Sequence, residues 1–158
     1  MKRVAIFLLI LEFSLANSCT SDKEQRISTA FKVVELLNEQ KAEKLHDMIL
    51  LDADKIGLDT FRIRHDCKAF RFFTDKYGFP DSSKWKYIEN PNDWVEPYKV
   101  EFPIFDGNDT VGNWNLRKVS LEVNFGPKKF NRVSKIADYH LVLDFDVDWK
   151  STKEPPQY

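Results

Sequence analysis

The spacing of apolar residues changes once along this chain, and the change limits the folds open to it. Between residues 27 and 49, and again from Thr60 to Tyr77, apolar side chains recur at helical spacing. From Trp85 onward apolar and polar residues alternate, as in strands with one buried face. Helices followed by alternating strands predict an α+β domain, in which N-terminal helices pack on a curved antiparallel meander sheet.

Residues with turn and capping preferences set the expected boundaries. The first helix should break near Asn38, and the second should begin at the capping pair Asp59 and Thr60 and end before Gly78. Two strands should flank a hairpin turn at residues 106–109, and residues 133–149 should form a last strand or strand pair. Residues 151–158, which contain two adjacent prolines, are expected to form a tail.

The second helix carries apolar residues on two sides. At about 100° per residue, Ile63, Cys67 and Phe70 share one arc, whereas Phe61 and Phe72 lie opposite. A helix with this pattern is expected to be covered on both sides.

Two helices, the first with a short dividing piece, followed by long strands resemble the cone-shaped superfamily of nuclear transport factor 2 and the cystatins. The resemblance covers residues 27–149. It implies a pocket between the helices and the curved sheet. Members include isomerases, dehydratases, binding proteins and scaffold partners, so the fold alone does not select a function.

The N-terminus has the features of an export signal. Lys2 and Arg3 precede an apolar stretch, Val4–Leu11, that is too short to span a bilayer. The next segment, Leu15–Cys19, resembles the lipobox of bacterial lipoproteins, in which a cysteine after a small residue becomes lipidated and forms the new N-terminus. The resemblance implies that residues 1–18 are removed. An ordinary cleaved signal before a soluble protein, or a buried N-terminal helix, is the alternative.

A lipid on Cys19 would anchor the domain to a membrane of the cell envelope, on the periplasmic or the surface side of an outer membrane. The polar residues 19–26 are then expected to form a tether, and their acidic character resembles the surface-export signals of some Bacteroidetes lipoproteins. Alternatively, Ser21 and Glu24 form a capping box that opens the first helix.

Length and charge narrow the remaining possibilities. Removing 18 of 158 residues leaves 140, enough for the single domain expected over residues 27–150. The removed segment takes Lys2, Arg3 and Glu12 from 24 basic and 25 acidic residues, so the mature net charge is −2. Nucleic acid is not an expected partner, because phosphate contacts need a surplus or stripe of basic residues.

Motifs for cofactors are missing from the sequence. The glycine-containing segment 107–112 continues as Asn113-Trp114, where a phosphate-binding loop needs a lysine and a hydroxyl residue. No paired-cysteine or zinc-helix motif occurs, so neither a cofactor nor a metal is expected. With Cys19 lipidated, Cys67 would have no disulfide partner, and its apolar neighbours favour a small buried side chain over a reactive thiol.

Asp66 is the one candidate catalytic residue. On the helical wheel it lies beside the arc of Cys67 and Phe70, so it is expected to border an apolar pocket. Burial would raise its pKa and suit it to act as a general base, with His65 or Tyr77 as a helper. The alternative is a boundary aspartate that is hydrogen-bonded to an arginine or to backbone. Burial of Asp66 within hydrogen-bond reach of a histidine or tyrosine would favour the enzyme.

Two further groups of residues are candidates for binding. Aromatic residues in and after the second helix can bind a sugar or a partner, or can cap the core; with two apolar residues expected in the pocket, the candidates are Tyr77, Trp85, Tyr87, Trp94, Phe70 and Phe102. Alternation on the last strand places Asp144, Asp146 and Asp148 on one face, with Asp138 and His140. This face is expected to be a solvated surface, with a cation or a basic partner as the alternative.

These observations favour a membrane-tethered, non-catalytic module that binds a small ligand or an envelope protein. Its pocket should be mainly apolar, with at most one ionisable group facing it. The first alternative is a small enzyme of isomerase or dehydratase type that uses Asp66. The second is an accessory subunit of a cell-envelope complex, recognised through its aromatic residues.

Overall fold

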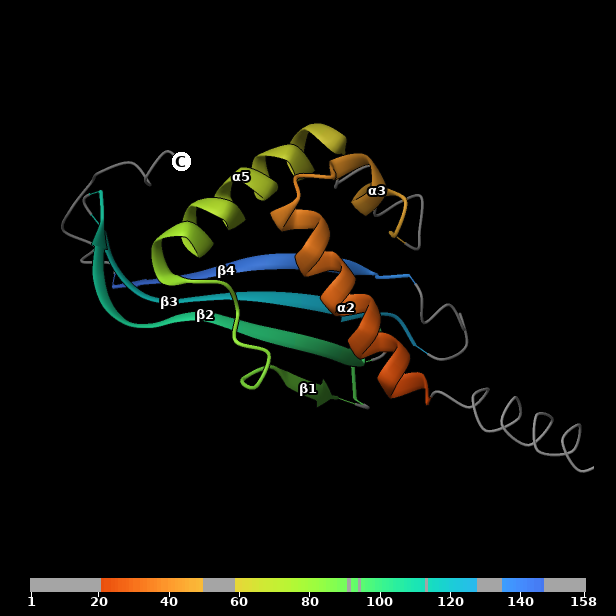
Figure 1. The fold of residues 1–158 in the computed structure, drawn as a ribbon. Helices are drawn as coiled ribbons and strands as arrows, with labels where there is room; N and C mark the ends of the chain where they lie inside the picture. Colours follow the sequence, from red (N-terminus) through yellow and green to blue (C-terminus); the bar gives the residue numbers. More distant parts are fainter. Residues whose placement is uncertain are drawn as a thin grey trace, which may run out of the picture.

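The computed structural model describes residues 21–49, 59–90, 92–93, 95–112, 114–127 and 135–146. The helices are α2 (Asp22–Asn38), α3 (Ala42–His46) and α5 (Thr60–Tyr77), and the strands are β1 (Lys86–Glu89), β2 (Tyr98–Val111), β3 (Trp114–Phe125) and β4 (Asp138–Asp146). The strands form one antiparallel meander in the order β1-β2-β3-β4. Figure 1 shows the helices on one side of the curved sheet, which confirms the predicted α+β architecture.

Helix α2 begins earlier than the predicted tether allows. Ser21 caps it: the Ser21 hydroxyl accepts from the Glu24 amide at 3.2 Å, and the Glu24 carboxylate accepts from the Ser21 amide at 2.8 Å. This capping box satisfies two backbone amides that would otherwise lack a partner, so residues 22–26 are helical rather than extended. The expected break after Asn38 is confirmed, and Gln40 there has a positive φ of 55°.

Helix α5 has the predicted boundaries, but only one of its two apolar sides is packed against the rest of the domain. The Asp59 carboxylate accepts from the Arg62 amide at 2.7 Å, and the chain leaves the helix at Gly78, whose φ is 97°. The arc that contains Ile63 and Phe70 is buried. On the opposite side, Phe61 is 78% exposed and Phe72 is 41% exposed, so the expectation that both sides are covered is wrong.

The first long hairpin turns later than predicted. Residues 106–109 lie inside β2, and two residues separate Val111 from its partner Trp114. The register shifts between Asp106 and Asp109, so a β-bulge accommodates the turn-forming residues without ending the strand. A Cβ atom at Gly107 would lie 3.1 Å from the Phe105 ring, so a larger residue there would require this ring to shift by a few tenths of an ångström. The predicted last strand corresponds to β4, and residues 147–158 lie outside the described part of the chain.

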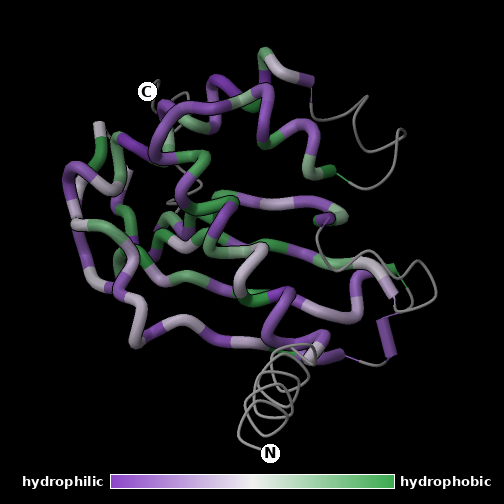
Figure 2. The backbone as a smooth tube through the Cα atoms, turned by 45° about the vertical axis from the view of Figure 1, so that its right-hand side comes forward, coloured by the Kyte–Doolittle hydropathy of each residue, from purple (hydrophilic) through white to green (hydrophobic). Residues whose placement is uncertain are grey.

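The core lies between the helices and the inner face of the sheet, where segments rich in hydrophobic residues come together (Figure 2). Alternation along β3 directs Leu121, Val123 and Phe125 to this face, and each is at most 1% exposed. Phe70 from α5 and Phe102 from β2 belong to the same cluster. These two candidate pocket residues are thus buried side chains of the core.

Candidate functional site

A small polar cleft lies between α5 and β4. Its volume is about 120 Å³, and its lining comprises Arg62, Asp66 and Ala69 from the helix and Tyr139, His140 and Leu141 from the strand. We call it the α5–β4 cleft. It differs from the predicted pocket, which was expected to be apolar with at most one ionisable group, because four of its six lining side chains are ionisable.

The central contact of this cleft joins Asp66 to Tyr139. The Tyr139 hydroxyl donates to Asp66 Oδ2 at 3.0 Å, and the tyrosine is only 2% exposed. Burial raises the pKa of the half-buried Asp66 carboxyl, while the Tyr139 hydrogen bond and then the charge of Arg62 oppose that rise. Burial, together with the negative charge of Asp66, raises the pKa of Tyr139 strongly. The phenol is therefore a donor here and not a base.

Local structure explains how the two residues meet. Asp66 lies on the border of the buried arc of α5, as the helical wheel predicted. Tyr139 lies on the inner face of β4, where the period of two places it between the outward-facing Asp138 and His140. Sequence reasoning did not find Tyr139, although its place in the alternation from Asp138 to Asp146 was a usable signal.

The helpers proposed for Asp66 from the sequence lie elsewhere. The Tyr77 hydroxyl donates to Asp109 Oδ2 at 2.7 Å, near the end of the long hairpin, and Lys76 is 2.8 Å from the same atom. Lys76, then Tyr77, and then the Thr110 amide lower the pKa of Asp109 to about 2 through these hydrogen bonds. His65 lines a different hollow on the outer side of α5. Tyr139 takes the place that the sequence analysis gave to His65 or Tyr77.

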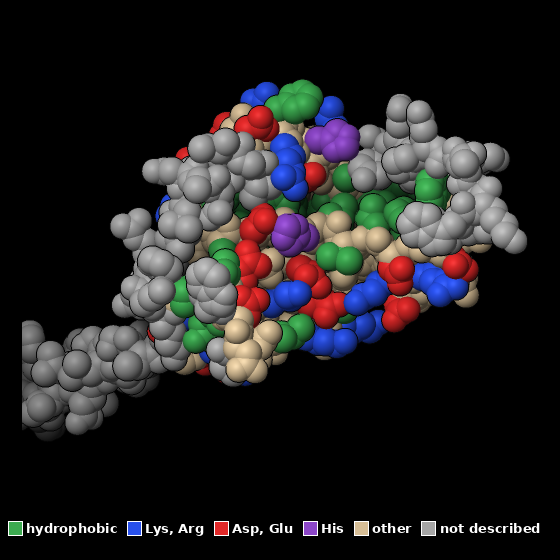
Figure 3. Space-filling view, turned by 180° about the vertical axis from the view of Figure 1, so that it is seen from behind, with side chains coloured by type: hydrophobic (Ala, Val, Ile, Leu, Met, Phe, Trp, Pro, Cys, Tyr) green, Lys and Arg blue, Asp and Glu red, His purple; other side chains and the backbone are tan. Residues whose placement is uncertain are grey.

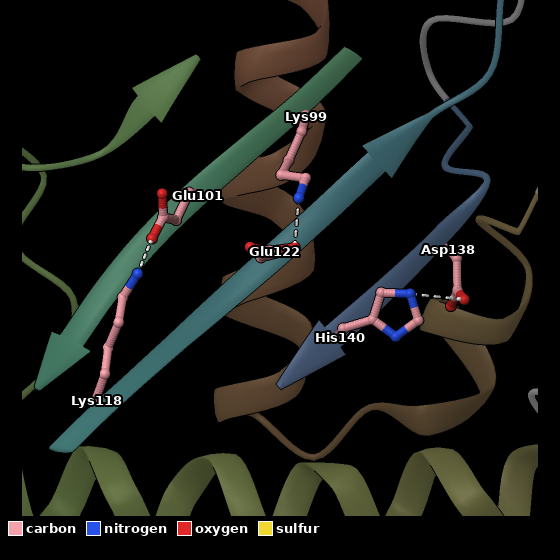
Figure 4. Close-up of polar contacts among 6 residues, drawn as sticks. All are labelled: Lys99, Glu101, Lys118, Glu122, Asp138 and His140. Carbon is pink, nitrogen blue, oxygen red and sulfur yellow. Dashed lines mark hydrogen bonds and ion pairs between the residues drawn. The ribbon is translucent and has the colours of Figure 1, made fainter. Parts of the chain in front are cut away.

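His140 connects the cleft to the outer face of the sheet. It lines the cleft, and its Nε2 lies 3.2 Å from Asp138 Oδ2. Figure 4 shows this pair beside two cross-strand ion pairs, Lys99–Glu122 at 2.6 Å and Lys118–Glu101 at 2.7 Å. Acidic and basic side chains are interleaved over this face (Figure 3).

The predicted acidic face of the last strand is present in β4 and is partly neutralised. Asp144 and Asp146 are exposed, and Arg117 on β3 lies 2.6 Å from Asp146. Asp148 lies outside the described residues. Within the part of the chain that the structure describes, no three His, Cys, Asp or Glu side chains come close enough to hold a metal ion.

The aromatic residues predicted to bind do not gather in one place. Trp85 and Tyr87 lie beneath α2, where Trp85 contacts Phe31 at 6.2 Å between ring centres. The buried Arg26 guanidinium lies 3.9 Å from the centre of the Tyr98 ring and donates to the Tyr87 hydroxyl at 3.5 Å. This part of the aromatic run attaches α2 to the β1 edge of the sheet.

The other aromatic candidates are separate from that group. The Tyr77 ring stacks on Phe105 at 4.2 Å between ring centres, next to the second core cluster. Phe70 and Phe102 lie in the main core, and Trp94 lies outside the described residues.

Cys67 is a core residue of α5. It is 1% exposed, and burial raises the pKa of its thiol to about 11. Its position confirms the prediction of a small buried side chain, and its slow reactivity stays a prediction.

Comparison with known proteins gives this chain no family. No known family, curated protein or solved structure matches it. Among the described residues, no helix is long and apolar enough to span a membrane. The fold defines the chain as an α+β domain with helices on one face of an antiparallel meander sheet.

Proposed function

We propose that this chain is an extracytoplasmic lipoprotein, lipidated at Cys19, whose domain is a non-catalytic binding module. The observation that carries the binding role is the α5–β4 cleft. It combines the half-buried carboxylate of Asp66 and the buried phenol of Tyr139 with the side chains of Arg62 and His140. Such convergent polar groups can orient one polar group of a ligand or of an envelope protein. The domain's resemblance to the nuclear transport factor 2 and cystatin superfamily is compatible with this role.

The size of the cleft favours binding over catalysis. At about 120 Å³ it holds roughly four water volumes, whereas sites that enclose a small molecule typically measure about 300–1,000 Å³. A cleft of this size accepts one carboxylate, amide or guanidinium group of a larger partner. An enzyme would also need to exclude water from the rest of its substrate.

The position of the cleft suits a tethered protein. Helix α2 starts at Asp22, and three residues of extended chain from Cys19 span at most about 10 Å. The first turns of α2 contact Tyr87 on β1 and Tyr98 on β2, whereas the cleft lies at β4, the opposite edge of the sheet. Three strand spacings of about 4.8 Å separate the two edges, so an anchor at α2 would leave the cleft away from the bilayer.

Lipidation is tested by replacing Cys19. We expect Cys19→Ala to abolish labelling by a fatty-acid probe and to release the protein from the membrane fraction. Cys67→Ala is the matched control and should label and partition as the parent does. Equal labelling of Cys19→Ala and the parent would contradict the anchor.

Binding at the cleft is tested with small polar fragments. Acetate, acetamide and guanidinium are titrated into the mature protein while the NMR signals of Tyr139 and His140 are recorded. At least one fragment should shift these signals, and Arg62→Ala should weaken the acetate response. Shifts confined to other parts of the protein would remove the cleft as the binding site.

The enzyme alternative is favoured by one specific observation, the half-buried position of Asp66 within hydrogen-bond reach of Tyr139. A carboxyl with a raised pKa can act as a general base, and Arg62 could stabilise a developing negative charge. Asp66→Asn separates the two proposals, because the amide still accepts the Tyr139 hydrogen bond but cannot take a proton. Loss of isomerase or dehydratase turnover in a folded Asp66→Asn protein would establish the enzyme, and retained fragment binding without turnover would support the module.

A further inference from the structure

The uncovered side of α5 carries two exposed phenylalanines. At about 100° per residue, Phe61, Lys68 and Phe72 fall within an arc of about 40° that points away from the core. Phe61 is 78% exposed and Phe72 is 41% exposed. Figure 3 shows an exposed hydrophobic side chain at the outer end of the helical layer with Lys or Arg side chains on either side. Exposed apolar surface rimmed by polar side chains marks an interaction site more often than a single exposed residue does, and Phe61 is the part of this side that lines a hollow with such a rim.

A hollow lies at the N-terminal end of this side. Its volume is about 370 Å³, and its lining consists of Gln40 from the turn after α2 and Phe61, Arg64, His65 and Lys68 from α5. We call it the α5 hollow. It is larger than the α5–β4 cleft and shares no lining residue with it.

The charge of the hollow is positive, although the chain as a whole is nearly neutral. Arg64 Nη2 lies 2.5 Å from Glu43 Oε1 in an exposed ion pair. Among the described residues, no ion pair involves Lys68, the second lysine or arginine of the lining. Exposed pairs such as Arg64–Glu43 contribute little stability, so a partner carboxylate can compete for Arg64 at small cost.

We propose that the α5 hollow binds an acidic segment of a partner protein, with an apolar side chain of that segment on Phe61 and its carboxylates near Arg64 and Lys68. Charge complementarity selects an acidic partner, and the exposed phenylalanine selects one that also carries an apolar side chain.

A protein is favoured over a bilayer by the position of the hollow, an argument that rests on the proposed anchor. Gln40, which lines the hollow, follows the C-terminal end of α2, whereas Cys19 precedes the N-terminal end of the same helix. The helix has 17 residues and is thus about 25 Å long. The hollow therefore lies about one helix length from the anchored end of the domain, away from the bilayer.

The test is a selection from a random peptide display library against the mature protein purified in detergent. We expect enriched peptides to contain aspartate or glutamate close to an aromatic or leucine residue. Their affinity, measured by fluorescence polarisation, should fall at least tenfold for Phe61→Ser and for Lys68→Glu. Val95→Ser and Lys84→Glu are matched controls, because both residues are exposed and lie outside the hollow, and they should bind as the parent does.

Several outcomes would overturn the proposal. One is the absence of acidic and apolar residues from the enriched peptides; another is equal binding by the parent and both hollow variants. A third is binding of the Cys19→Ala protein to vesicles of anionic phospholipid that depends on Phe61 and Lys68, which would assign the surface to a membrane. Failure of the fatty-acid labelling test would refute the anchor but would leave these peptide measurements valid.

Discussion

Replacement of Tyr139 by phenylalanine removes the hydroxyl that donates to Asp66 and keeps the buried ring. The hydrogen bond measures 3.0 Å, and Tyr139 is 2% exposed, so the ring should keep its position in the core. The perturbation is therefore confined to one hydrogen bond to a carboxyl group. The change in the free energy of unfolding therefore measures how much this hydrogen bond contributes to the stability of the domain.

The magnitude follows from the type of bond and the burial of its acceptor. A hydrogen bond to a charged group contributes about 1.5–3 kcal/mol, and water can partly replace the lost donor at the half-buried Asp66. We therefore expect Tyr139→Phe to lower the free energy of unfolding by about 1–2 kcal/mol at neutral pH. For a domain of this size, each kcal/mol corresponds to about 4 °C in Tm.

The effect should depend on pH with a defined sign. The raised pKa of Asp66 means that its contribution to stability is fully present in acid and is lost as the pH rises through the folded-state pKa. The Tyr139 hydrogen bond lowers that pKa, so Tyr139→Phe should raise it further. The variant should accordingly lose more stability at neutral pH than in acid, where Asp66 is uncharged.

Urea unfolding followed by circular dichroism at several pH values measures the stability, and NMR titration of the Asp66 carboxyl measures its pKa. Leu141→Val is a control that alters the same strand without touching the hydrogen bond. An unchanged or lowered pKa of Asp66 in Tyr139→Phe would refute the reasoning, as would a loss of stability that is the same in acid and at neutral pH.

Two further predictions concern the helices. Cys67 should react slowly with a thiol reagent in the native protein and rapidly in denaturant, because it is 1% exposed and its pKa is raised to about 11; rapid native labelling would instead indicate a functional thiol. Ser21→Ala should lower the free energy of unfolding by about 1 kcal/mol through loss of the cap on α2, whereas an unchanged urea midpoint would mean that this end of the helix adds nothing to the fold.

Periodicity was sufficient to predict the architecture of this chain. Helical spacing located α2 and α5, and the period of two located β2, β3 and β4, because each pattern reflects the side of an element that must be buried. The turn at residues 106–109 was placed wrongly for a physical reason. Its residues favour turns, but a β-bulge can accommodate the same residues within a strand, and which of the two forms depends on pairing with β3.

The candidate site could be predicted only in part. The wheel placed Asp66 at the edge of the buried arc, which is a local property of α5. Its partner Tyr139 lies 73 residues away, and local spacing contains no information on which strand packs beside the helix. The same limit applies to the aromatic residues. Some lie in the core, some contact α2 and one stacks on the long hairpin, and tertiary packing decides which position each takes.

Helix α5 connects the two candidate sites. One side supplies Ile63 and Phe70 to the core, its border supplies Asp66 to the cleft, and its outer side supplies Phe61 and Lys68 to the hollow. Burial fixes the first side, so substitutions there would disturb both sites through the fold. The outer side is free of that constraint, since a side chain that remains 78% exposed contributes little to packing. Phe61 therefore presents its apolar surface to the hollow rather than to the core, where the proposed partner segment would cover it.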